Sequence, residues 1–266
     1  SYYGIHHNEN LDQTALINEA IIASAQAGVY ALDFGSMRVQ TQGNHRLYYD
    51  ATDNPDFPDV ASAMGFRLTG TGNSSRASYT TGVKTGSSTL KLLSSTNSLI
   101  IAGNGDAFSD GNSVLGNRAV QIQGLNMVGV TSAPLVNFNG SPQNSFVKDA
   151  FLANLGSGDI VRVHQAWLVM LENLDCWGSS SDTPSAGIGI NFDSDLGVAA
   201  GMNFVTNVTV TGKVVGQRYG NLYDATDNKA SWVNTLTGCQ ARKCDYGFQF
   251  FSGAQCLVVN PWTENN

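Results

Sequence analysis

The chain has 266 residues, a formal net charge of −7, and only 13% charged residues. This length can bury a sizeable core in one elongated domain. Proteins that bind nucleic acid or anionic membranes present basic patches, so we expect neither as a partner. Glycine is abundant, with 29 residues, and a composition poor in helix formers and rich in turn formers predicts mostly short strands.

The sequence contains neither a recognisable secretion signal at its start nor a membrane-spanning stretch. The segment SYYGIHHNEN lacks the basic and apolar regions of a secretion signal, and no stretch is long and apolar enough to cross a bilayer. The chain starts without Met and stops at NPWTENN without a closing element, so we expect a segment of a longer protein.

The cysteines predict no metal site. They lie in the last third of the chain and form no Cys-x-x-Cys pair, which argues against zinc. We expect buried free thiols that act as small apolar side chains, and neither a metal nor another cofactor. The four residues are Cys176, Cys239, Cys244 and Cys256.

Residues 12–28, DQTALINEAIIASAQAG, have a clear helical pattern. Asp12 or Thr14 is expected to cap the start, and Gly28 suits the left-handed position after the end. A strand is expected in residues 29–40, VYALDFGSMRVQ. Helical spacing relates the following residues: Leu16, Ile17, Ala20, Ile21 and Ser24.

From residue 66 onward, short runs with period-two alternation are separated by Gly, Asn, Ser or Pro. Examples are FRLTGTG, AVQIQG, DIVRVH and GIGINFD. A β-sandwich also gives this pattern, so the spacing has to decide. One unit recurs roughly every 25 residues, with an insertion near 193–203. The alignment puts these residues in register: Leu125, Phe151, Leu174, Val208, Leu236 and Val258.

Such a unit is the right size for one coil of a solenoid. Asn173 and Asn207 precede aligned residues, with Asn234 displaced by one. Asparagine tolerates the left-handed conformation of a sharp corner, and its amide can bond to the same residue of the next coil. We therefore predict an all-β fold, a right-handed parallel β-helix with coils about 4.8 Å apart, closed at its first coil by the N-terminal helix.

The predicted organisation has three parts. Residues 1–39 form an N-terminal cap of helix and first strand, and residues 40–65, which are rich in proline, form a loop excursion. Residues 66–266 form the coils, which we expect to be cut short at the C-terminal end.

The first third of the chain resembles the pectate-lyase superfamily of β-helices. That family has an Asp-x-Thr before a capping helix, matched here by Asp12 and Thr14, and then a Pro-x-Gly-x-Tyr-x-Val turn. Gly35 and Val39 match the turn, while Asp33 stands in place of the usual Pro and Met37 in place of Tyr. FRLTGTG followed by STLKL resembles the next family element.

Within the superfamily, the low charge and the abundance of Gly, Ser, Asn and Thr are most like bacteriophage tailspikes and depolymerases. This resemblance implies a homotrimer on a virion tail, in contact with tail or baseplate proteins. It also implies binding, and often cleavage, of a bacterial surface polysaccharide (capsule, exopolysaccharide or O-antigen) outside the host cell. A fold does not by itself carry a function, so a non-catalytic tail-fibre adhesin remains an alternative.

Carboxylates on successive coils are the candidates for acid and base catalysis of glycoside hydrolysis. Asp193 and Asp195 follow the alternating run GIGINFD and precede the insertion. One acidic pair is expected a coil earlier and another a coil later. The candidate catalytic residues are Asp193, Asp195, Asp224, Asp227, Glu172 and Asp175.

A lyase would instead need a base and a cation that holds a uronate carboxylate. Arg162 and His164 lie two residues apart on one expected outward face, and tyrosines lie near a later coil. Tryptophans are candidate platforms for sugar rings. The candidate substrate-binding residues are Trp177, Trp232, Tyr219, Tyr223, Arg162 and His164.

The hexapeptide YDATDN occurs twice, around Asp50 and around Asp224. The first copy precedes the regular ladder and is expected to be an Asx-turn loop. The second copy is expected one coil from Asp193, which makes Asp224 and Asp227 the more promising of the two sets for chemistry.

Overall fold

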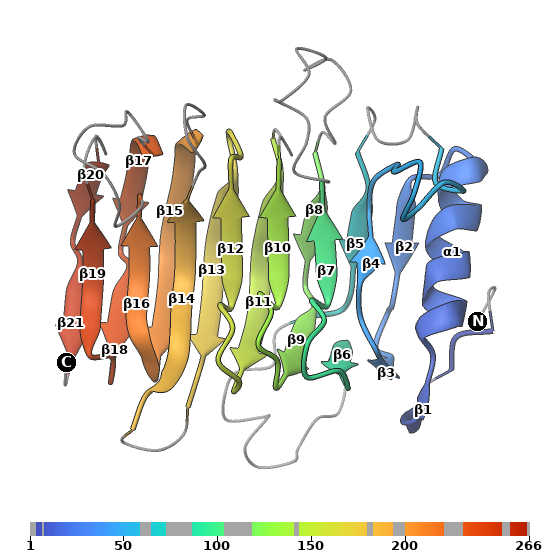
Figure 1. Ribbon diagram of the computed structural model, residues 1–266, viewed down its shortest axis with the longest axis horizontal. Coiled ribbons are helices and arrows are strands. Elements are labelled where there is room, and N and C mark those ends of the chain that lie inside the picture. The colour runs from blue at the N-terminus through green and yellow to red at the C-terminus, as the bar shows by residue number, and fades with distance from the viewer. Residues whose placement is uncertain are drawn as a thin grey trace.

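The computed structural model describes residues 4–6, 8–58, 65–72, 87–103, 119–140, 144–179, 183–193, 200–220, 231–251 and 256–264. Within them, helix α1 (Thr14–Gln26) precedes a long stack of parallel strands (Figure 1). The protein is an all-β, right-handed parallel β-helix, as the spacing predicted. No described helix is long and apolar enough to span a membrane.

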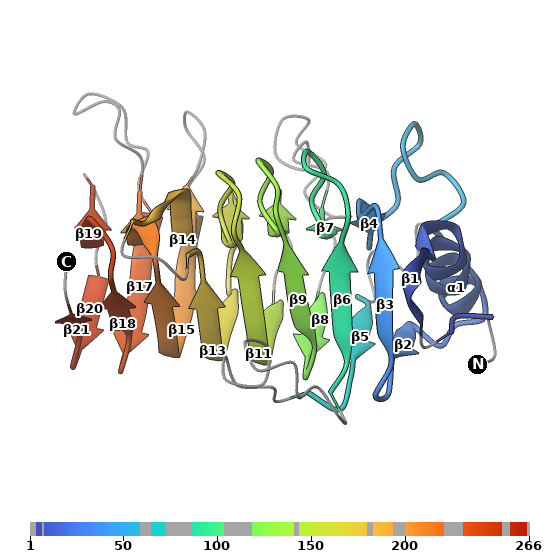
Figure 2. The same cartoon turned by 90° about the horizontal axis from the view of Figure 1, so that it is seen from below.

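The coils have three faces, and faces 1 and 2 belong to one fourteen-stranded sheet. Face 1 contains β2 (Ala31–Asp33), β5 (Arg67–Thr69), β8 (Gln121–Gln123), the first parts of β11 (Phe146–Asn154), β13 (Met170–Trp177) and β15 (Ala200–Thr211), then β17 (Ser231–Thr237) and β20 (Cys256–Val259). Face 2 contains β1 (Asn8–Asp12), β3 (Arg38–Thr41), β6 (Thr89–Leu92), β9 (Asn126–Gly129), the second parts of β11, β13 and β15, then β18 (Gln240–Arg242) and β21 (Trp262–Glu264). Figure 2 shows face 2 side by side from β1 to β21.

Face 3 is a separate seven-stranded sheet. Its strands are β4 (His45–Arg46), β7 (Ile100–Ala102), β10 (Val136–Asn139), β12 (Val161–His164), β14 (Ser185–Asp193), β16 (Lys213–Tyr219) and β19 (Tyr246–Phe250).

A column of inward side chains runs through the stack. Phe138, Val163 and Phe192 stand in register on face 3 and are fully buried. The rings of Phe192 and Tyr219 stack at 5.1 Å between centroids, and Tyr219 stacks on Phe250 at 5.4 Å. Burying one such side chain contributes about 1.5–3 kcal/mol, so the continuous column is the main source of stability.

The cysteines are free thiols. Cys176, Cys239 and Cys244 are buried, as predicted, and Cys256 is half-buried. Burial raises the pKa of each of these thiols. They therefore stay protonated and inert at neutral pH.

The corner between faces 1 and 2 is built by residues with positive φ. Asp149, Asn173 and Asn207 have φ of 53°, 53° and 52°, and Gly238 continues the series at 63°. Asn173 Nδ2 donates to Asp149 Oδ1 at 2.9 Å, and Asn207 Nδ2 donates to Asn173 Oδ1 at 3.2 Å. The predicted asparagine corner is thus confirmed for Asn173 and Asn207. Asn234 lies inside instead, where it accepts a hydrogen bond from a buried asparagine on β15.

The predicted register is right for two pairs and wrong for the others. Leu174 faces Val208, and Leu236 faces Val258, as expected. However, Leu174 faces Ala150 on the preceding coil, one residue before the predicted Phe151. Leu236 faces Val205, three residues before the predicted Val208. The reason is the corner residue, which interrupts the period-two alternation and shifts the inward parity by one within a single strand.

Helix α1 covers the N-terminal end of the column, as predicted (Figure 1). Its end follows the expected pattern, because Gly28 has φ 72° and its N–H donates to Ala25 O. The predicted start is wrong: the N-cap is Gln13, which makes no side-chain cap hydrogen bond. Asp12 Oδ1 instead accepts hydrogen bonds from the backbone N–H and the hydroxyl of Thr14.

The segment 40–65 differs from the predicted loop excursion at its beginning. β3 ends at Thr41, and β4 (His45–Arg46) is already the first strand of face 3, where it pairs with β7. The coils thus begin before residue 66, because buried residues in this segment join the core. Asp50 Oδ1 accepts the backbone N–H groups of Thr52 and Asp53, both at 2.8 Å, so the first YDATDN copy is the expected Asx turn.

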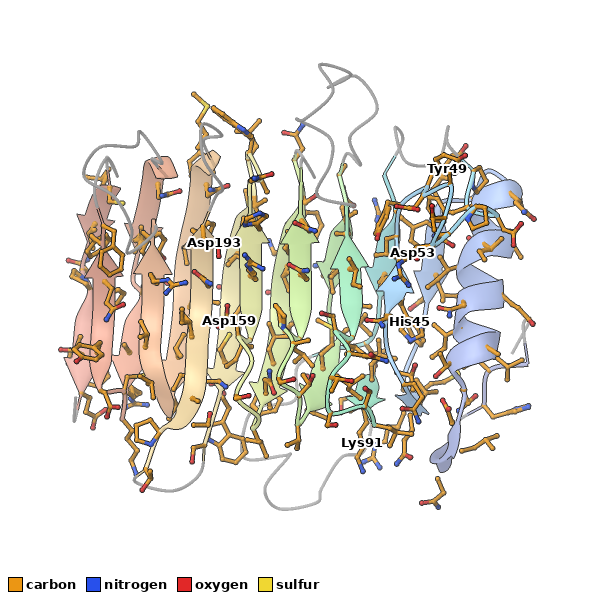
Figure 3. The ribbon with its side chains drawn as sticks, viewed as in Figure 1. His45, Tyr49, Asp53, Lys91, Asp159 and Asp193 are labelled. Atoms are coloured by element: carbon orange, nitrogen blue, oxygen red, sulfur yellow. The ribbon has the colours of Figure 1, made fainter. Side chains whose placement is uncertain are left out.

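His45 joins helix α1 to the first coil by hydrogen bonds and makes the N-terminal end of the protein sensitive to acid. It is fully buried, with Nδ1 2.6 Å from Asn18 Oδ1 and Nε2 2.7 Å from Thr41 Oγ1 (Figure 3). Burial lowers the pKa of His45 from 6.5 to about 4, partly offset by the charge of Asp12.

Acid should therefore destabilise the folded protein. Between pH 6.5 and about 4 the unfolded chain binds a proton at His45 that the folded chain does not. The unfolding free energy should fall by up to about 3 kcal/mol as the pH falls through this window. Denaturant midpoints at pH 7 and pH 4.5 measure this loss. The His45→Gln variant should lose clearly less over the same range, and an equal loss in both proteins contradicts this assignment.

Candidate active site

The outer surface of face 3 carries a polar cluster. In β12 and β14 inward apolar side chains alternate with polar ones that point outward, and in β16 Arg218 takes the outward position between the buried residues Gln217 and Tyr219. The outward polar residues form two levels in register across the coils: Arg162, Asn191 and Arg218 on one level, and His164 and Asp193 on the next.

Asp193 lies at the centre of the first group of contacts. Arg162 Nε donates to both of its carboxylate oxygens, at 3.2 and 3.0 Å. His164 Nδ1 lies 2.7 Å from Asp193 Oδ1 and 3.2 Å from Arg162 Nη2. Asp193 is 6% exposed. Its position is thus fixed by two neighbours on the preceding strand.

Asn191 bridges Asp193 to a second carboxylate, Asp159. Its Nδ2 lies 2.8 Å from Asp159 Oδ2 and 3.4 Å from Asp193 Oδ2. Since one atom touches both, the two carboxylate oxygens lie no more than about 6 Å apart, and glycosidase carboxyl pairs are separated by about 5 to 9.5 Å. Figure 3 shows Asp159 and Asp193 on the same side of the β-helix.

Asp159 is held by a rigid turn before β12. Any Cβ on Gly158 would collide with the carbonyl oxygen of Ala133 on the neighbouring coil, so only glycine fits there. Lys213, fully buried, donates from Nζ to the carbonyls of Gly156, Gly158 and Ala186 at 2.8–2.9 Å. Lys213 therefore fixes the turn that carries Asp159. Burial lowers the pKa of Lys213 to about 8, against the opposing charge of Asp159.

Burial raises the pKa of Asp159 above its ordinary value, and the charge of Asp193 acts in the same direction. Hydrogen bonds from Asn191 and from the backbone N–H of Ile188, together with the charge of Arg218, oppose this shift. A carboxyl with a raised pKa is suited to donate a proton. A neighbouring carboxylate fixed by Arg162 is suited to act as base or nucleophile.

The structure brings together three of the residues predicted from the sequence: Asp193, Arg162 and His164. It does not bring Glu172 and Asp175 to them, because the corner at Asn173 turns these two side chains onto faces 1 and 2. Glu172 instead pairs with Lys148 at 3.1 Å. The predicted row of acidic pairs on successive coils is therefore wrong for this coil.

Two predicted sugar-binding residues are buried. Trp177 lies on face 2, is 4% exposed and packs against Phe151 at 6.3 Å between ring centroids. Tyr219 points into the core, where its hydroxyl donates to Gln217 Oε1. Neither presents an open ring to a sugar, so both assignments are corrected. Asp195, Asp224, Asp227, Tyr223 and the side chain of Trp232 lie outside the described residues.

Sequence reasoning missed Asp159, Asn191 and Arg218. Asn191 shares the outward parity of Arg162 in a strand that the sequence did predict, so the alternation contained the signal for this residue. Arg218 lies in β16, a strand that the sequence reading did not include. Asp159 follows a Gly-Ser-Gly turn that looks like an ordinary loop, and only the packing of that turn reveals it. Among the described residues, no group of three His, Cys, Asp or Glu could hold a metal ion.

No family model matches the chain, and no curated protein matches it. Among solved structures, the catalytic domain of a GH87 α-1,3-glucanase in complex with nigerose has a TM-score of 0.61 at 14% identity, covering 93% of this chain and 37% of that one. A GH87 α-1,3-glucanase variant in complex with tetrasaccharides has a TM-score of 0.55 at 12% identity, covering 98% and 39%. What these proteins share with this chain is the fold. The chain spans less than two thirds of the length of either structure.

Proposed function

We propose that this protein binds and cleaves a bacterial surface polysaccharide, as a phage tailspike depolymerase does, and that the reaction is glycoside hydrolysis. The observation that carries the proposal is the carboxylate pair Asp159 and Asp193, bridged by Asn191 on the outer surface of face 3. The family resemblance supports it, as does a fold shared with glucanase catalytic domains.

In the proposed mechanism the two carboxyl groups have different roles. Asp159, whose pKa is raised by burial, gives its proton to the oxygen of the glycosidic bond as the bond breaks. Asp193, held by Arg162 and His164, receives the developing positive charge. A separation of no more than about 6 Å fits the retaining mechanism, in which Asp193 attacks the anomeric carbon. Water then breaks the glycosyl ester, and Asp159 takes the proton of that water, which restores both carboxyl groups.

The test is incubation of the protein with purified surface polysaccharides of candidate hosts. Hydrolysis produces new reducing ends without ultraviolet absorbance from unsaturated uronates, whereas β-elimination produces both. If no polysaccharide that the protein binds is shortened, the proposed chemistry is wrong.

A non-catalytic adhesin is the second candidate, and one observation favours it. Asp193 is only 6% exposed and is fully engaged with Arg162 and His164, as a structural carboxylate would be. An adhesin of this kind would bind its glycan equally well with Asp193→Asn and would never shorten it. The hydrolase keeps binding in that variant and loses cleavage.

We also propose a homotrimer on a virion tail, joined to tail or baseplate proteins, from the family resemblance. A row of outward residues on face 1 supports it: Phe146, Met170 and Phe204 lie in register on successive coils, and Leu257 follows after one coil that carries Thr235. Met170, Phe204 and Leu257 are 41%, 43% and 61% exposed. Light scattering measures the mass in solution, and a monomer at micromolar concentration would contradict the proposal.

A further inference from the structure

Arg218 on β16 is a cation without a carboxylate partner among the described residues. Its Nε donates to Asn191 Oδ1 at 3.1 Å, and its side chain is partly exposed. Arg162 and Arg242, by contrast, each form an ion pair, with Asp193 and Glu264. The bond to Asn191 fixes the guanidinium and leaves its two terminal nitrogens without a described partner. These two nitrogens form a planar fork that matches a carboxylate with two parallel hydrogen bonds.

The position of this fork relates it to the proposed chemistry. Asn191 accepts from Arg218 through Oδ1 and donates to both Asp159 and Asp193 through Nδ2. The charge of Arg218 also acts on Asp159, whose pKa it lowers. The cation therefore lies about one coil, roughly 4.8 Å, beyond the residue that joins the carboxylate pair.

The charges of the cluster leave one place for an anion. Asp193 repels a negative group, and Arg162 is occupied by Asp193 and lies against His164. Within the described part of this cluster, only the outer end of Arg218 presents uncompensated positive charge beside the pair. A polysaccharide on this surface would meet the carboxylates at one coil and the guanidinium fork at the next.

We propose that Arg218 binds the carboxylate of an acidic sugar residue next to the bond that is cleaved. This inference rests on the proposed function and specifies its substrate class, a glycan that carries carboxylated sugars. It assigns substrate recognition to Arg218 and not to Arg162, the arginine that the sequence suggested for this role. Arg162 instead positions Asp193.

The probe is methyl glucuronide, compared with methyl glucoside, with binding to the whole chain followed by ligand-observed NMR. We expect the wild type to bind the glucuronide more tightly than the glucoside. Arg218→Gln should weaken glucuronide binding at least about tenfold, because a charge-assisted pair is lost, and leave the glucoside unchanged. Arg67→Gln is the matched control: Arg67 Nε also donates to an amide oxygen, that of Gln121, but on face 1 and away from the carboxylate pair.

Several results would overturn the inference. One is equal binding of the two glycosides by the wild type. Another is a loss of glucuronide binding in the Arg67→Gln control as large as that in Arg218→Gln. Displacement of the glucuronide by inorganic phosphate or sulfate at equal concentration would identify a general anion site instead. Glucuronide binding that depends on Arg218, without cleavage of any glycan, rejects the proposed hydrolysis and keeps the anion site. Cleavage of a neutral glycan without glucuronide binding rejects the anion site and keeps the proposed hydrolysis.

Discussion

Replacing Asp159 by Asn should reduce the rate of polysaccharide cleavage by about 10²–10⁴-fold, the usual contribution of a general acid. The amide keeps the shape of the side chain and can still accept the backbone N–H of Ile188, but it has no acidic proton to transfer to the glycosidic oxygen. Asp193→Asn should cause a loss of similar size, because it removes the negative charge that faces Arg162 and His164. The initial rate of reducing-end formation measures both.

Glu172→Gln is the matched control for these variants. Glu172 is a carboxylate that the sequence also suggested, but it lies on face 1 in an ion pair with Lys148. Its loss should leave cleavage within about twofold of the wild type, since exposed ion pairs contribute little even to stability. Full activity in Asp159→Asn, with unchanged circular dichroism and melting temperature, would contradict the role assigned to Asp159.

Replacing Phe192 by Ala should lower the unfolding free energy by about 3–5 kcal/mol, the largest effect on stability that we expect from one substitution. Phe192 is fully buried, directly behind the outward residues Asn191 and Asp193. Its ring stacks on Tyr219 at 5.1 Å, and Val163 is its partner on the other neighbouring coil. The loss opens a cavity in the column that supports the candidate site.

Denaturant midpoints test this expectation against two matched variants. Phe192→Leu keeps most of the apolar volume and should cost about 1.5 kcal/mol or less. Leu93→Ala changes a side chain that is 40% exposed and should cost about 0.5 kcal/mol. If Phe192→Ala costs no more than Leu93→Ala, the inward column does not support face 3 as described.

The fold was predictable from the sequence because its signals are local and repeated. Period-two runs identify strands, and spacing of about 25 residues separates a solenoid from a sandwich. The corner at Asn173 and Asn207 was predictable because a left-handed residue and an amide ladder require few residue types. The register at Phe151 was not, because the corner shifts parity inside one strand and leaves no mark in the hydrophobic pattern.

The candidate site was only partly predictable. Asp193, Arg162 and His164 could be predicted, because the alternating apolar residues of their strands point inward and leave these three side chains on the outward side. Asp159 could not be found in this way, because its position depends on the buried amine of Lys213, 54 residues later in the chain, and on the close approach of Gly158 to Ala133. Contacts across such a sequence separation become visible only when the coils are stacked.

The most direct test is the crystal structure of the Asp159→Asn variant with an oligosaccharide from the polysaccharide that the wild type cleaves. We predict that the sugar chain lies on the outer surface of face 3, across β12, β14 and β16. The oxygen of its scissile glycosidic bond should lie within hydrogen-bond distance of the substituted side chain at position 159, and its anomeric carbon should face Asp193. An oligosaccharide bound on face 1 or face 2, away from both positions, would contradict the proposed active site.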